Sequence, residues 1–510
     1  MTGHDGWFGV DAVRKDLRAR SVRAGVIAAG ARGVQILLSF GSVAVLARTL
    51  TPEDFGVFAM VLPITILVNT CINHALQTSV IHRSDLDHEQ ASGMFWLTAR
   101  VNAVIAAAMA LAGPLLARFY GDSRVAGLAA AWAAVLWLAS LSAIHEALLK
   151  RQMRFGMVMG IGVASALAGV VGAIAAALAG AGYWALFVQV GVMDLFRLAA
   201  LWIACRWRPA SPTHAAKTDC SEGLREMRQY WLHLTGFRAL SWLGDYPDRM
   251  LAGWAGGAGT LGLYDGGRRW AWYPFTELYL SLSDVAVASF SRVGRDADQY
   301  RRFVSRGLLP VLAVSLPAIA FIFVEARSAV LVLLGGQWLG AVPFVRLMTV
   351  AAFVGSLSRL MQWIYLSLGE TRRQLRWAMR VQTPVMLAAV VIGARWGALG
   401  VAGGFTAGTC VLTLPAIAWC LHVAPLRFRD YMAVVWRPVS AAVAAAALLF
   451  ALGDRLPSLT PLAFDLLLRL ALFLAAYALV FLATPGGRAS AGAAFAALRD
   501  VRARPPSDQA

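Results

Sequence analysis

Arginines inside long apolar stretches are the residues of this sequence best suited to chemistry. A charge at the centre of a membrane-spanning helix costs about 2.5–3.5 kcal/mol, so it needs a buried partner or a polar cavity. Twelve arginines lie in such stretches, and the deepest are Arg32, Arg100, Arg238, Arg268 and Arg269. A guanidinium binds phosphate or carboxylate oxygens through two parallel hydrogen bonds. The set therefore predicts binding of an anionic group, and the alternative is structural pairing with acids inside the membrane.

Two aspartates share a predicted helix with Arg238. Asp245 follows it by seven residues and therefore lies on the same helix face, and Asp248 lies about one turn further on. One interpretation is an ion-coupling site for a cation or a proton. The other is that the two carboxylates neutralise nearby arginines. Both remain open at this stage.

Aromatic residues cluster beside Pro274, at Trp270, Trp272 and Tyr273. Aromatic faces stack on sugar rings, but Trp and Tyr are also common packing and interface residues in membrane proteins.

Two ion pairs within single helices are also predicted. Asp465 precedes Arg469 by four residues and Asp194 precedes Arg197 by three, and both spacings allow helical ion pairs. His145 and Glu146 are expected to be interfacial.

The remaining patterns argue against an enzyme. No phosphate-binding glycine loop, nucleophile motif or paired-carboxylate pattern occurs in a supporting context. The five cysteines are scattered without metal-ligand spacing, so we expect no metal site, no disulfide framework and no cofactor.

Composition places these residues in a membrane protein. Of 510 residues, 59% are hydrophobic and 15% are charged, against about 25% charged in soluble domains. The net charge of +18 comes from basic residues in short gaps between apolar stretches, so we exclude nucleic acid as a partner. We expect no cleavable signal peptide, because the first apolar stretch is long enough to span.

A spanning helix needs about 20 apolar residues. Fourteen stretches meet this requirement, and they predict an all-α polytopic membrane protein. They are 22–47, 55–80, 91–117, 125–148, 155–179, 182–205, 229–254, 259–290, 303–325, 341–368, 376–394, 397–422, 431–452 and 461–484.

Loop charge orients these spans. With the N-terminus in the cytoplasm, cytoplasmic segments hold 28 Lys and Arg residues and the opposite loops hold 6. This asymmetry follows the positive-inside rule and predicts that both termini are cytoplasmic. The loops are too short for a folded catalytic domain of about 50 residues.

A weak internal repeat divides the chain. Phe55-Gly56-Val57-Phe58 corresponds to Leu261-Gly262-Leu263-Tyr264 at an offset of 206 residues, which also relates Arg32 to Arg238. Six spans per repeat is an even number, which predicts two parallel six-helix bundles related by an axis along the membrane normal. We expect cytoplasmic segments at 1–21, 206–228 and 485–510, bundles at 22–205 and 229–422, and two extra helices within 431–484.

These motifs resemble a known family. The stretch from Leu46 to Phe58, with Thr51-Pro52-Glu53-Asp54 at its centre, is similar to the junction of the first two helices in polysaccharide flippases. These flippases belong to the multidrug/oligosaccharidyl-lipid/polysaccharide transporter superfamily. Asp248-Arg249-Met250-Leu251-Ala252-Gly253, the basic turn from Leu148 to Phe155, and Gly182-Tyr183-Trp184-Ala185-Leu186 resemble further family patterns. The resemblance covers about residues 20–430.

The resemblance implies a bacterial inner-membrane flippase of lipid-linked oligosaccharide, working by alternating access through a cationic central cavity. The product would be O-antigen, capsule or exopolysaccharide, with membrane lipids, a polysaccharide polymerase and glycosyltransferases as partners. Two alternatives remain: a cation-coupled multidrug exporter of the same fold, and a membrane glycan polymerase or ligase. An exporter of cationic drugs should favour acids over arginines in its cavity, and a polymerase usually carries its reactive residues on a sizeable outer loop.

Overall fold

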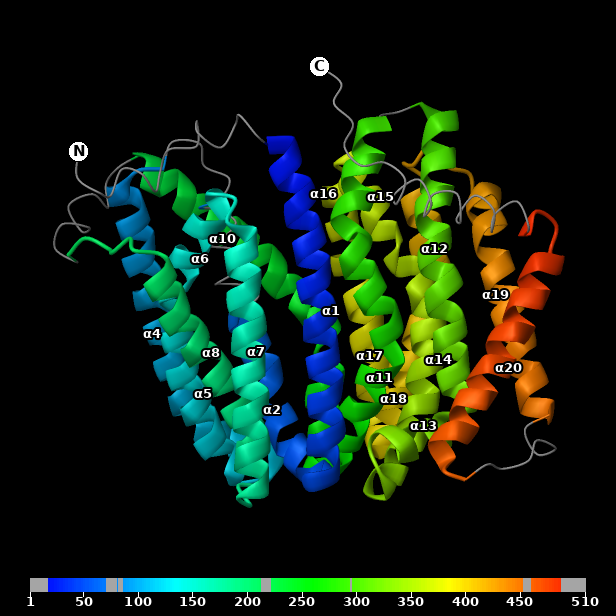
Figure 1. Ribbon diagram of the computed structural model, residues 1–510, viewed down its shortest axis with the longest axis horizontal. Coiled ribbons are helices and arrows are strands. Elements are labelled where there is room, and N and C mark those ends of the chain that lie inside the picture. Colours follow the sequence, from blue (N-terminus) through cyan, green and yellow to red (C-terminus); the bar gives the residue numbers. More distant parts are fainter. Residues whose placement is uncertain are drawn as a thin grey trace. The chain divides into compact units, whose positions relative to one another are not determined.

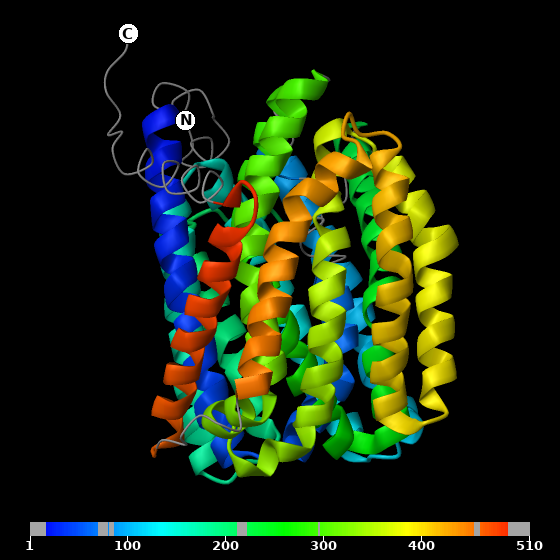
Figure 2. The ribbon, with the colours of Figure 1, turned by 90° about the vertical axis from the view of Figure 1, so that its right-hand side faces the viewer.

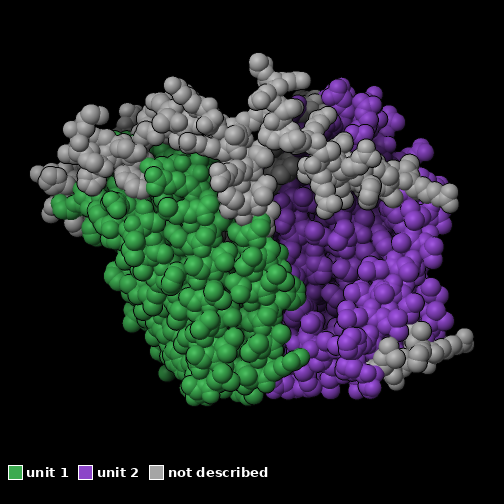
Figure 3. Space-filling model, in the orientation of Figure 1, with its two compact units in different colours: residues 1–262 green, residues 263–510 purple. Residues whose placement is uncertain are grey.

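The computed structural model of the protein is built from helices (Figure 1). The structure describes residues 17–69, 80, 86–211, 222–293, 296–452 and 460–487, and no strand occurs among them. Two compact units divide the chain, Met1–Gly262 and Leu263–Ala510 (Figure 3). Within the described residues, eleven helices are long and apolar enough to cross a membrane. The predicted all-α membrane-spanning class is confirmed.

The eleven spans match eleven of the fourteen that the sequence predicts. The other three are 55–80, 229–254 and 259–290. The first runs into residues 70–79, which lie outside the described part of the chain. The other two correspond to α10 and the long helix α11, which carry more charge than the eleven. The total of fourteen spans therefore stays a prediction.

Unit 1 contains eight complete described helices and the start of α11. The helices are α1 (Leu17–Thr49), α2 (Pro52–Val68), α4 (His88–Tyr120), α5 (Arg124–Ser140), α6 (Ala143–Arg151), α7 (Phe155–Leu178), α8 (Trp184–Ala204) and α10 (Glu222–Asp245). Among the packed pairs are α4 with α5, α7 with α8, and α1 with α7. The polar segments between them hold most of the glycines with positive φ in this unit, such as Gly121 at the end of α4.

Unit 2 begins within α11 (Pro247–Val293). It continues through α12 (Ala297–Val324), α13 (Ala326–Leu333), the short 3₁₀ helix η4 (Gly336–Ala341), α14 (Val342–Arg359), α15 (Met361–Leu368), α16 (Thr371–Trp377), the π-helical turn η5 (Ala378–Gln382), α17 (Thr383–Ala394), α18 (Gly397–Leu421), α19 (Phe428–Leu452) and α20 (Leu462–Ala483). Helices α17 and α18 run side by side, where glycines such as Gly393 and Gly404 allow close backbone contact (Figure 2).

The motif between α1 and α2 is a helix start built from local hydrogen bonds. The Thr51 hydroxyl accepts a hydrogen bond from the Asp54 amide, and the Asp54 carboxylate accepts one from the Thr51 amide at 2.9 Å. This reciprocal capping box satisfies amides at the open end of a helix, and Pro52 suits its first position because proline lacks an N–H group. Phe55 and Phe58 then pack against a buried cluster that includes Leu46, and so fix the entry to α2.

Helix α11 bends between the predicted spans 229–254 and 259–290. Gly257 has φ 70° and ψ −176°, which is not helical and is accessible to glycine without strain. A second break separates α10 from α11 directly before Pro247. The short segment from Pro247 to Gly257 therefore connects two breaks.

Two glycines bring α2 and the start of the second part of α11 into backbone contact. A β-carbon added at Gly56 would fall on the carbonyl of Ala258, and one added at Gly262 would fall on the carbonyl of Pro52. The repeat offset of 206 residues relates Pro52 to Ala258 and Gly56 to Gly262. Each glycine therefore contacts the residue that corresponds to the contact partner of the other glycine. The repeat thus exchanges the two contacts with each other, which supports the predicted correspondence between the start of α2 and the segment around Gly262.

One spanning segment in each unit is interrupted at a corresponding place. In unit 1 the segment Arg124–Arg151 breaks between α5 and α6, at Ser140–Ser142. In unit 2 the segment Gly336–Leu368 contains a break between α14 and α15, at Leu360. A Ser-Leu-Ser sequence lies at or just before each break, at Ser140–Ser142 and Ser356–Ser358. Interrupted helices in transporters commonly line the substrate path.

A buried ion cluster joins helix α20 to the rest of unit 2. Arg469 donates to Asp465 at 2.8 Å on its own helix and to Glu325 at 3.2 Å, between α12 and α13. The predicted Asp465–Arg469 pair is confirmed. The Tyr477 hydroxyl adds a hydrogen bond of 3.0 Å to the Ala313 carbonyl of α12.

Candidate functional site

The predicted site arginines of unit 2 lie on α11. Arg268 is half-buried, and its guanidinium carbon lies 4.6 Å from the centre of the Phe405 ring on α18. Arg269 is exposed and forms an ion pair of 3.6 Å with Asp265, one turn earlier on the same helix. A ring stabilises a cation without neutralising its charge. Arg268 therefore packs on an aromatic ring, whereas Arg269 has a carboxylate within reach.

A further arginine, Arg359, packs against α11 one helical turn after Arg268. It is exposed at the end of α14, and its guanidinium carbon lies 4.6 Å from the centre of the Trp272 ring on α11. The sequence places Arg359 among the twelve arginines of apolar stretches, but gives no reason to select it. Its aromatic support could not be read from the sequence, because Trp272 precedes it by 87 residues.

Trp272 itself was predicted as a sugar-stacking or packing residue. Its face carries the Arg359 guanidinium, so a sugar ring has no access to that face in this structure. Two turns further along α11, the Tyr279 ring stacks on Trp363 at 5.3 Å, and its hydroxyl donates to Gln362 at 2.9 Å. Polar aromatic side chains thus follow the arginines along one side of α11.

The unit 1 arginines lie on three different helices. Arg32 is exposed on α1, Arg100 is exposed on α4, and Arg238 is half-buried on α10. Of the two predicted ion-coupling residues, Asp248 is buried in the first turn of α11, with 3% of its surface exposed. Asp245 is the last residue of α10, and its side chain lies outside the described part of the structure. The roles of these five residues stay predictions.

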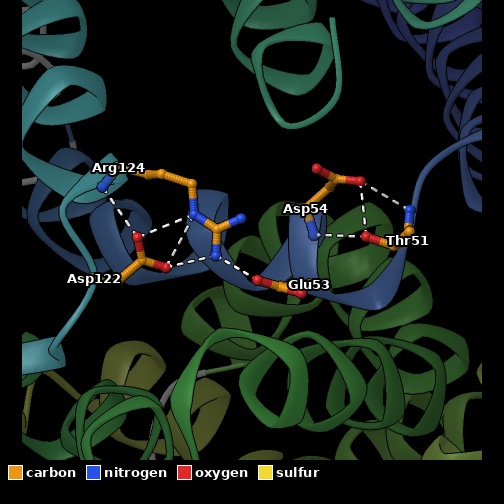
Figure 4. Close-up of polar contacts among 5 residues, drawn as sticks. All are labelled: Thr51, Glu53, Asp54, Asp122 and Arg124. Atoms are coloured by element: carbon orange, nitrogen blue, oxygen red, sulfur yellow. Dashed lines mark hydrogen bonds and ion pairs between the residues drawn. The ribbon is translucent and has the colours of Figure 1, made fainter. Parts of the chain in front are cut away.

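An ion-pair cluster joins two turns of unit 1, the one before α2 and the one before α5 (Figure 4). Arg124 binds Glu53 at the start of α2, and it contacts both carboxylate oxygens of Asp122, the shorter distance being 2.7 Å. Its guanidinium also lies 6.0 Å from the ring centre of Tyr183, before α8. The hydrogen bonds from Arg124 hold the pKa of the Asp122 carboxyl below its usual range. The cluster ties the turns of unit 1 together.

The far end of unit 1 contains buried groups that the sequence suggests are interfacial. His145 is fully buried, and its ring stacks on Trp202 at 4.5 Å. Glu146 is also buried, and it binds Lys150 at 2.7 Å and Arg197 at 2.6 Å. Both side chains are packed against α8, a burial that the sequence does not predict. Arg197, which the sequence predicts to pair with Asp194 on its own helix, binds Glu146 of α6.

The described residues contain no group of three or more histidine, cysteine or acidic side chains placed to hold a metal ion. The side chains described above around Trp272 and Tyr279 of α11 supply guanidinium, aromatic and amide groups. That set suits an anionic, hydroxyl-rich ligand, because arginine pairs with phosphate or carboxylate oxygens and amides pair with hydroxyls.

The comparison with protein families decides the affiliation. Residues 45–343 match the family model described as "Polysaccharide biosynthesis protein". The chain belongs to this family. The predicted relationship to polysaccharide flippases is thereby confirmed.

Curated relatives agree with the family. The lipopolysaccharide biosynthesis protein WzxC of Escherichia coli K12 is 22% identical over 448 residues, which cover 86% of this chain and 88% of WzxC. The succinoglycan biosynthesis transport protein ExoT of Rhizobium meliloti is 23% identical over 314 residues, 62% of either chain.

Solved structures show the fold. An inward-closed structure of the lipid II flippase MurJ superposes with a TM-score of 0.68 at 11% identity, covering 89% of this chain and 98% of MurJ. An inward-facing multidrug-resistance transporter of the MATE family gives a TM-score of 0.62 at 14% identity, covering 80% and 98%. The polypeptide therefore has the helical transporter fold that these flippases and exporters share.

Proposed function

We propose that the protein moves lipid-linked oligosaccharide repeat units across the bacterial inner membrane, for assembly of a surface polysaccharide such as O-antigen, capsule or exopolysaccharide. The observation that carries the proposal is the pair Arg268 and Arg359, two guanidinium groups inside the spans that rest on aromatic rings. The names of the relatives WzxC and ExoT support the same assignment.

In this proposal the headgroup crosses through a cationic cavity while the lipid tail stays in the bilayer. Arg32, Arg100, Arg238, Arg268 and Arg269 contribute the positive charge, and Asp245 and Asp248 either couple the cycle to an ion or neutralise neighbouring arginines. Alternating access follows from motion of two six-helix bundles, 22–205 and 229–422. Both termini lie in the cytoplasm, and a polysaccharide polymerase and glycosyltransferases act beside the protein.

The main rival is a cation-coupled multidrug exporter, since the MATE fold is shared. Its substrates are cations, which a positively charged cavity repels. Export assays separate the two functions. A strain that lacks the gene should lose its surface polysaccharide and keep its drug resistance, and the reverse pattern would favour the exporter.

Charge at Arg32 and Arg238 tests the cationic cavity. Arg→Ala at either position should abolish polysaccharide export, and Arg→Lys should retain part of it, because lysine keeps the charge but loses the two-pronged hydrogen bonding. Surface polysaccharide is measured in a strain lacking the native gene, with membrane abundance measured alongside. Arg118→Ala, at the exposed end of α4, is the matched control. Normal export by the Arg→Ala variants would remove these residues from the site, and loss of the protein from the membrane would make them structural.

A further inference from the structure

Three arginines lie along one exposed face of the helical arm that α16, η5 and α17 form in unit 2. Arg372 and Arg376 lie on α16, and Arg380 lies in the π-helical turn η5. All three residues are exposed. Successive members are four residues apart, so they occupy neighbouring turns of one helix face. We call these three residues the basic stripe.

The basic stripe has no acidic partner along its own part of the chain. The sequence contains no Asp or Glu between Glu370 and Asp430. Within the part of the chain that the structure describes, no ion pair joins a carboxylate to any of the three guanidinium groups. Arg301, at the same end of unit 2, binds both Asp298 and Asp430. The stripe therefore differs from the arginines that hold neighbouring helices together.

An arginine–tryptophan contact fixes how the arm is turned. The guanidinium carbon of Arg373 lies 4.5 Å from the centre of the Trp419 ring on α18, and the Trp377 ring lies 5.9 Å from the same ring. Arg373 also donates to the Trp419 carbonyl at 3.3 Å. Adjacent positions of a helix differ by about 100°. Because Arg372 and Arg376 each precede one of these contact residues, the basic stripe lies on the flank of the arm and not against α18.

The same face continues along α17 as an apolar surface. Every fourth residue after Arg380 is again exposed, at Pro384, Ala388 and Ile392. Ile392 is 55% exposed, and its neighbour Val391 is 54% exposed. Helix α17 packs mainly against α18, and it lies at the edge of unit 2 in Figure 2. Exposed apolar residues on a spanning helix mark a surface for lipid chains. The basic stripe is therefore the polar end of a face that contacts lipid.

The apolar part of this face is shorter than the hydrocarbon core of a bilayer. Arg380 and Arg395 bound it, and fifteen residues correspond to about 22 Å at 1.5 Å per residue. The hydrocarbon core is about 30 Å thick. A mismatch of this kind is accommodated when arginine side chains extend towards the headgroups and the bilayer thins locally. Arg380 thus brings lipid phosphates and the basic stripe together.

We propose that the basic stripe binds anionic phospholipids of the adjoining leaflet, which is the cytoplasmic leaflet in the predicted topology. Guanidinium groups bind phosphate oxygens through paired hydrogen bonds. Basic residues at the cytoplasmic end of spanning helices attract anionic headgroups. A lipid with two phosphates, such as cardiolipin, matches a row of charges one helical turn apart. The ligand is a membrane lipid and not the transported substrate, so the inference is independent of the proposed function.

Native mass spectrometry of the purified full-length protein tests the proposal, with cardiolipin as the probe and phosphatidylcholine as the zwitterionic control. One basic residue near an anionic lipid surface changes the affinity about five-fold. The triple variant Arg372→Gln, Arg376→Gln, Arg380→Gln should therefore bind the first cardiolipin about 100-fold more weakly. Its binding of phosphatidylcholine should stay unchanged. The corresponding triple Arg→Lys variant keeps the charge and should retain most of the affinity.

Arg395→Gln is the matched control, because Arg395 is an exposed arginine at the opposite end of the same arm. It should bind cardiolipin like the wild type. Melting temperature gives a second readout, since a ligand that binds the folded state stabilises it. Cardiolipin should raise the melting temperature of the wild type and of Arg395→Gln more than phosphatidylcholine does. The triple Gln variant should lose this difference.

Wild-type affinity for cardiolipin in the triple Gln variant would overturn the proposal, and so would equal losses for both lipids. If the triple variant does not reach the membrane, the double variant Arg372→Gln, Arg376→Gln replaces it, with an expected loss of about 25-fold. Unchanged binding by the double variant would be equally decisive against the stripe. Displacement of cardiolipin by farnesyl diphosphate but not by phosphatidylglycerol would assign the stripe to the transported substrate and reject a phospholipid site.

Discussion

At the scale of single residues, arginines in this protein fall into two groups by their partners. Arg124, Arg197 and Arg469 bind carboxylates, and each joins separate helices or turns. Arg268 and Arg359 rest on aromatic rings. A carboxylate neutralises a guanidinium charge, whereas a ring attracts the cation without carrying a counter-charge. The two groups therefore differ in the side chains that contact the guanidinium, and substitution tests whether they also differ in role.

Removal of Arg469 should destabilise the protein strongly. Arg469→Ala leaves Glu325 and Asp465 buried without their cation, and breaking a buried pair in this way costs about 3–5 kcal/mol. We expect a lower melting temperature in detergent and less protein in the membrane. Replacing all three residues by leucine removes the unpaired charges together and should recover most of the loss. A triple variant as unstable as Arg469→Ala would contradict this explanation.

The Asp122–Arg124 pair should give a small acid-sensitive contribution to stability. The folded-state pKa of Asp122 is lowered by its hydrogen bonds from Arg124, whereas an unfolded aspartate titrates at about 3.9. The ionised pair therefore stabilises the protein above about pH 4, and this contribution is lost as the pH falls through the folded-state pKa. Because the pair is partly exposed, we expect Asp122→Asn to cost under about 1 kcal/mol at pH 7.

Melting temperatures of wild type and Asp122→Asn check this sign. Their difference should be largest at neutral pH and should shrink towards pH 3. Asp298→Asn is the control, because the Asp298 side chain is 80% exposed and its loss should have little effect at any pH. A difference that grows on acidification would show that the pair has another role.

The sequence predicted residue-level pairs only where the partners are close in the chain. Asp465 and Arg469 are four residues apart, and the helical period alone relates them. Glu325 completes the same cluster from 144 residues away, and Trp272 supports Arg359 from 87 residues away. These contacts depend on how helices pack, which the apolar pattern of a spanning helix does not encode. The burial of His145 and Glu146 was missed for the same reason.

At the scale of elements, the crossing of α2 and α11 depends on the absence of side chains. Gly56 and Gly262 each face a backbone carbonyl, so any β-carbon forces the helices apart. The sequence repeat related these glycines to each other, but it gave no indication that their two segments touch. The junction of α1 and α2, by contrast, was visible as Thr51-Pro52-Glu53-Asp54, although only the structure shows that these residues form a capping box at the start of α2.

Gly56→Ala should impair folding or transport more than a Gly→Ala substitution at a glycine that faces solvent or lipid. The added methyl group would overlap the Ala258 carbonyl, and overpacking of this kind costs about 1–3 kcal/mol or more. Gly262→Ala should behave alike, because its contact is the symmetric one. Gly41→Ala on α1 is the control, since nothing lies within 4 Å of its added carbon. Equal melting temperatures for the Gly41 and Gly56 variants would show that the crossing is loose.

At the scale of the whole molecule, composition and periodicity were enough for the class of fold, because each spanning helix satisfies its own backbone hydrogen bonds and must be apolar over its length. Eleven predicted spans coincide with described helices to within a few residues, as with 397–422 and α18. The predicted spans 229–254 and 259–290 fall on α10 and α11, which are more highly charged and are not among the eleven. Those two helices carry three of the candidate site residues, Arg238, Arg268 and Arg269.

Topology is the molecular property that the fold and the charge pattern together predict. In unit 1, the turn before α5 contacts the start of α2 through Arg124 and Glu53, so these turns share one end of the unit. The start of α4 lies against the segment after α8, through the hydrogen bond from Trp207 to His88, and that end carries the basic turn after α6. The positive-inside rule assigns the second end to the cytoplasm.

Single cysteines at Ser123 and Arg154 test this assignment, because both positions are exposed and they follow α4 and α6 respectively. In a variant whose native cysteines are replaced, a membrane-impermeant thiol reagent should label Ser123→Cys in spheroplasts with an intact inner membrane. Arg154→Cys should be labelled only after that membrane is permeabilised. The reverse pattern would invert the orientation, and labelling of both in intact spheroplasts would break the alternation of spans. In either case the prediction that both chain ends are cytoplasmic would be wrong, because it depends on the same number of membrane crossings and the same 28-to-6 charge asymmetry.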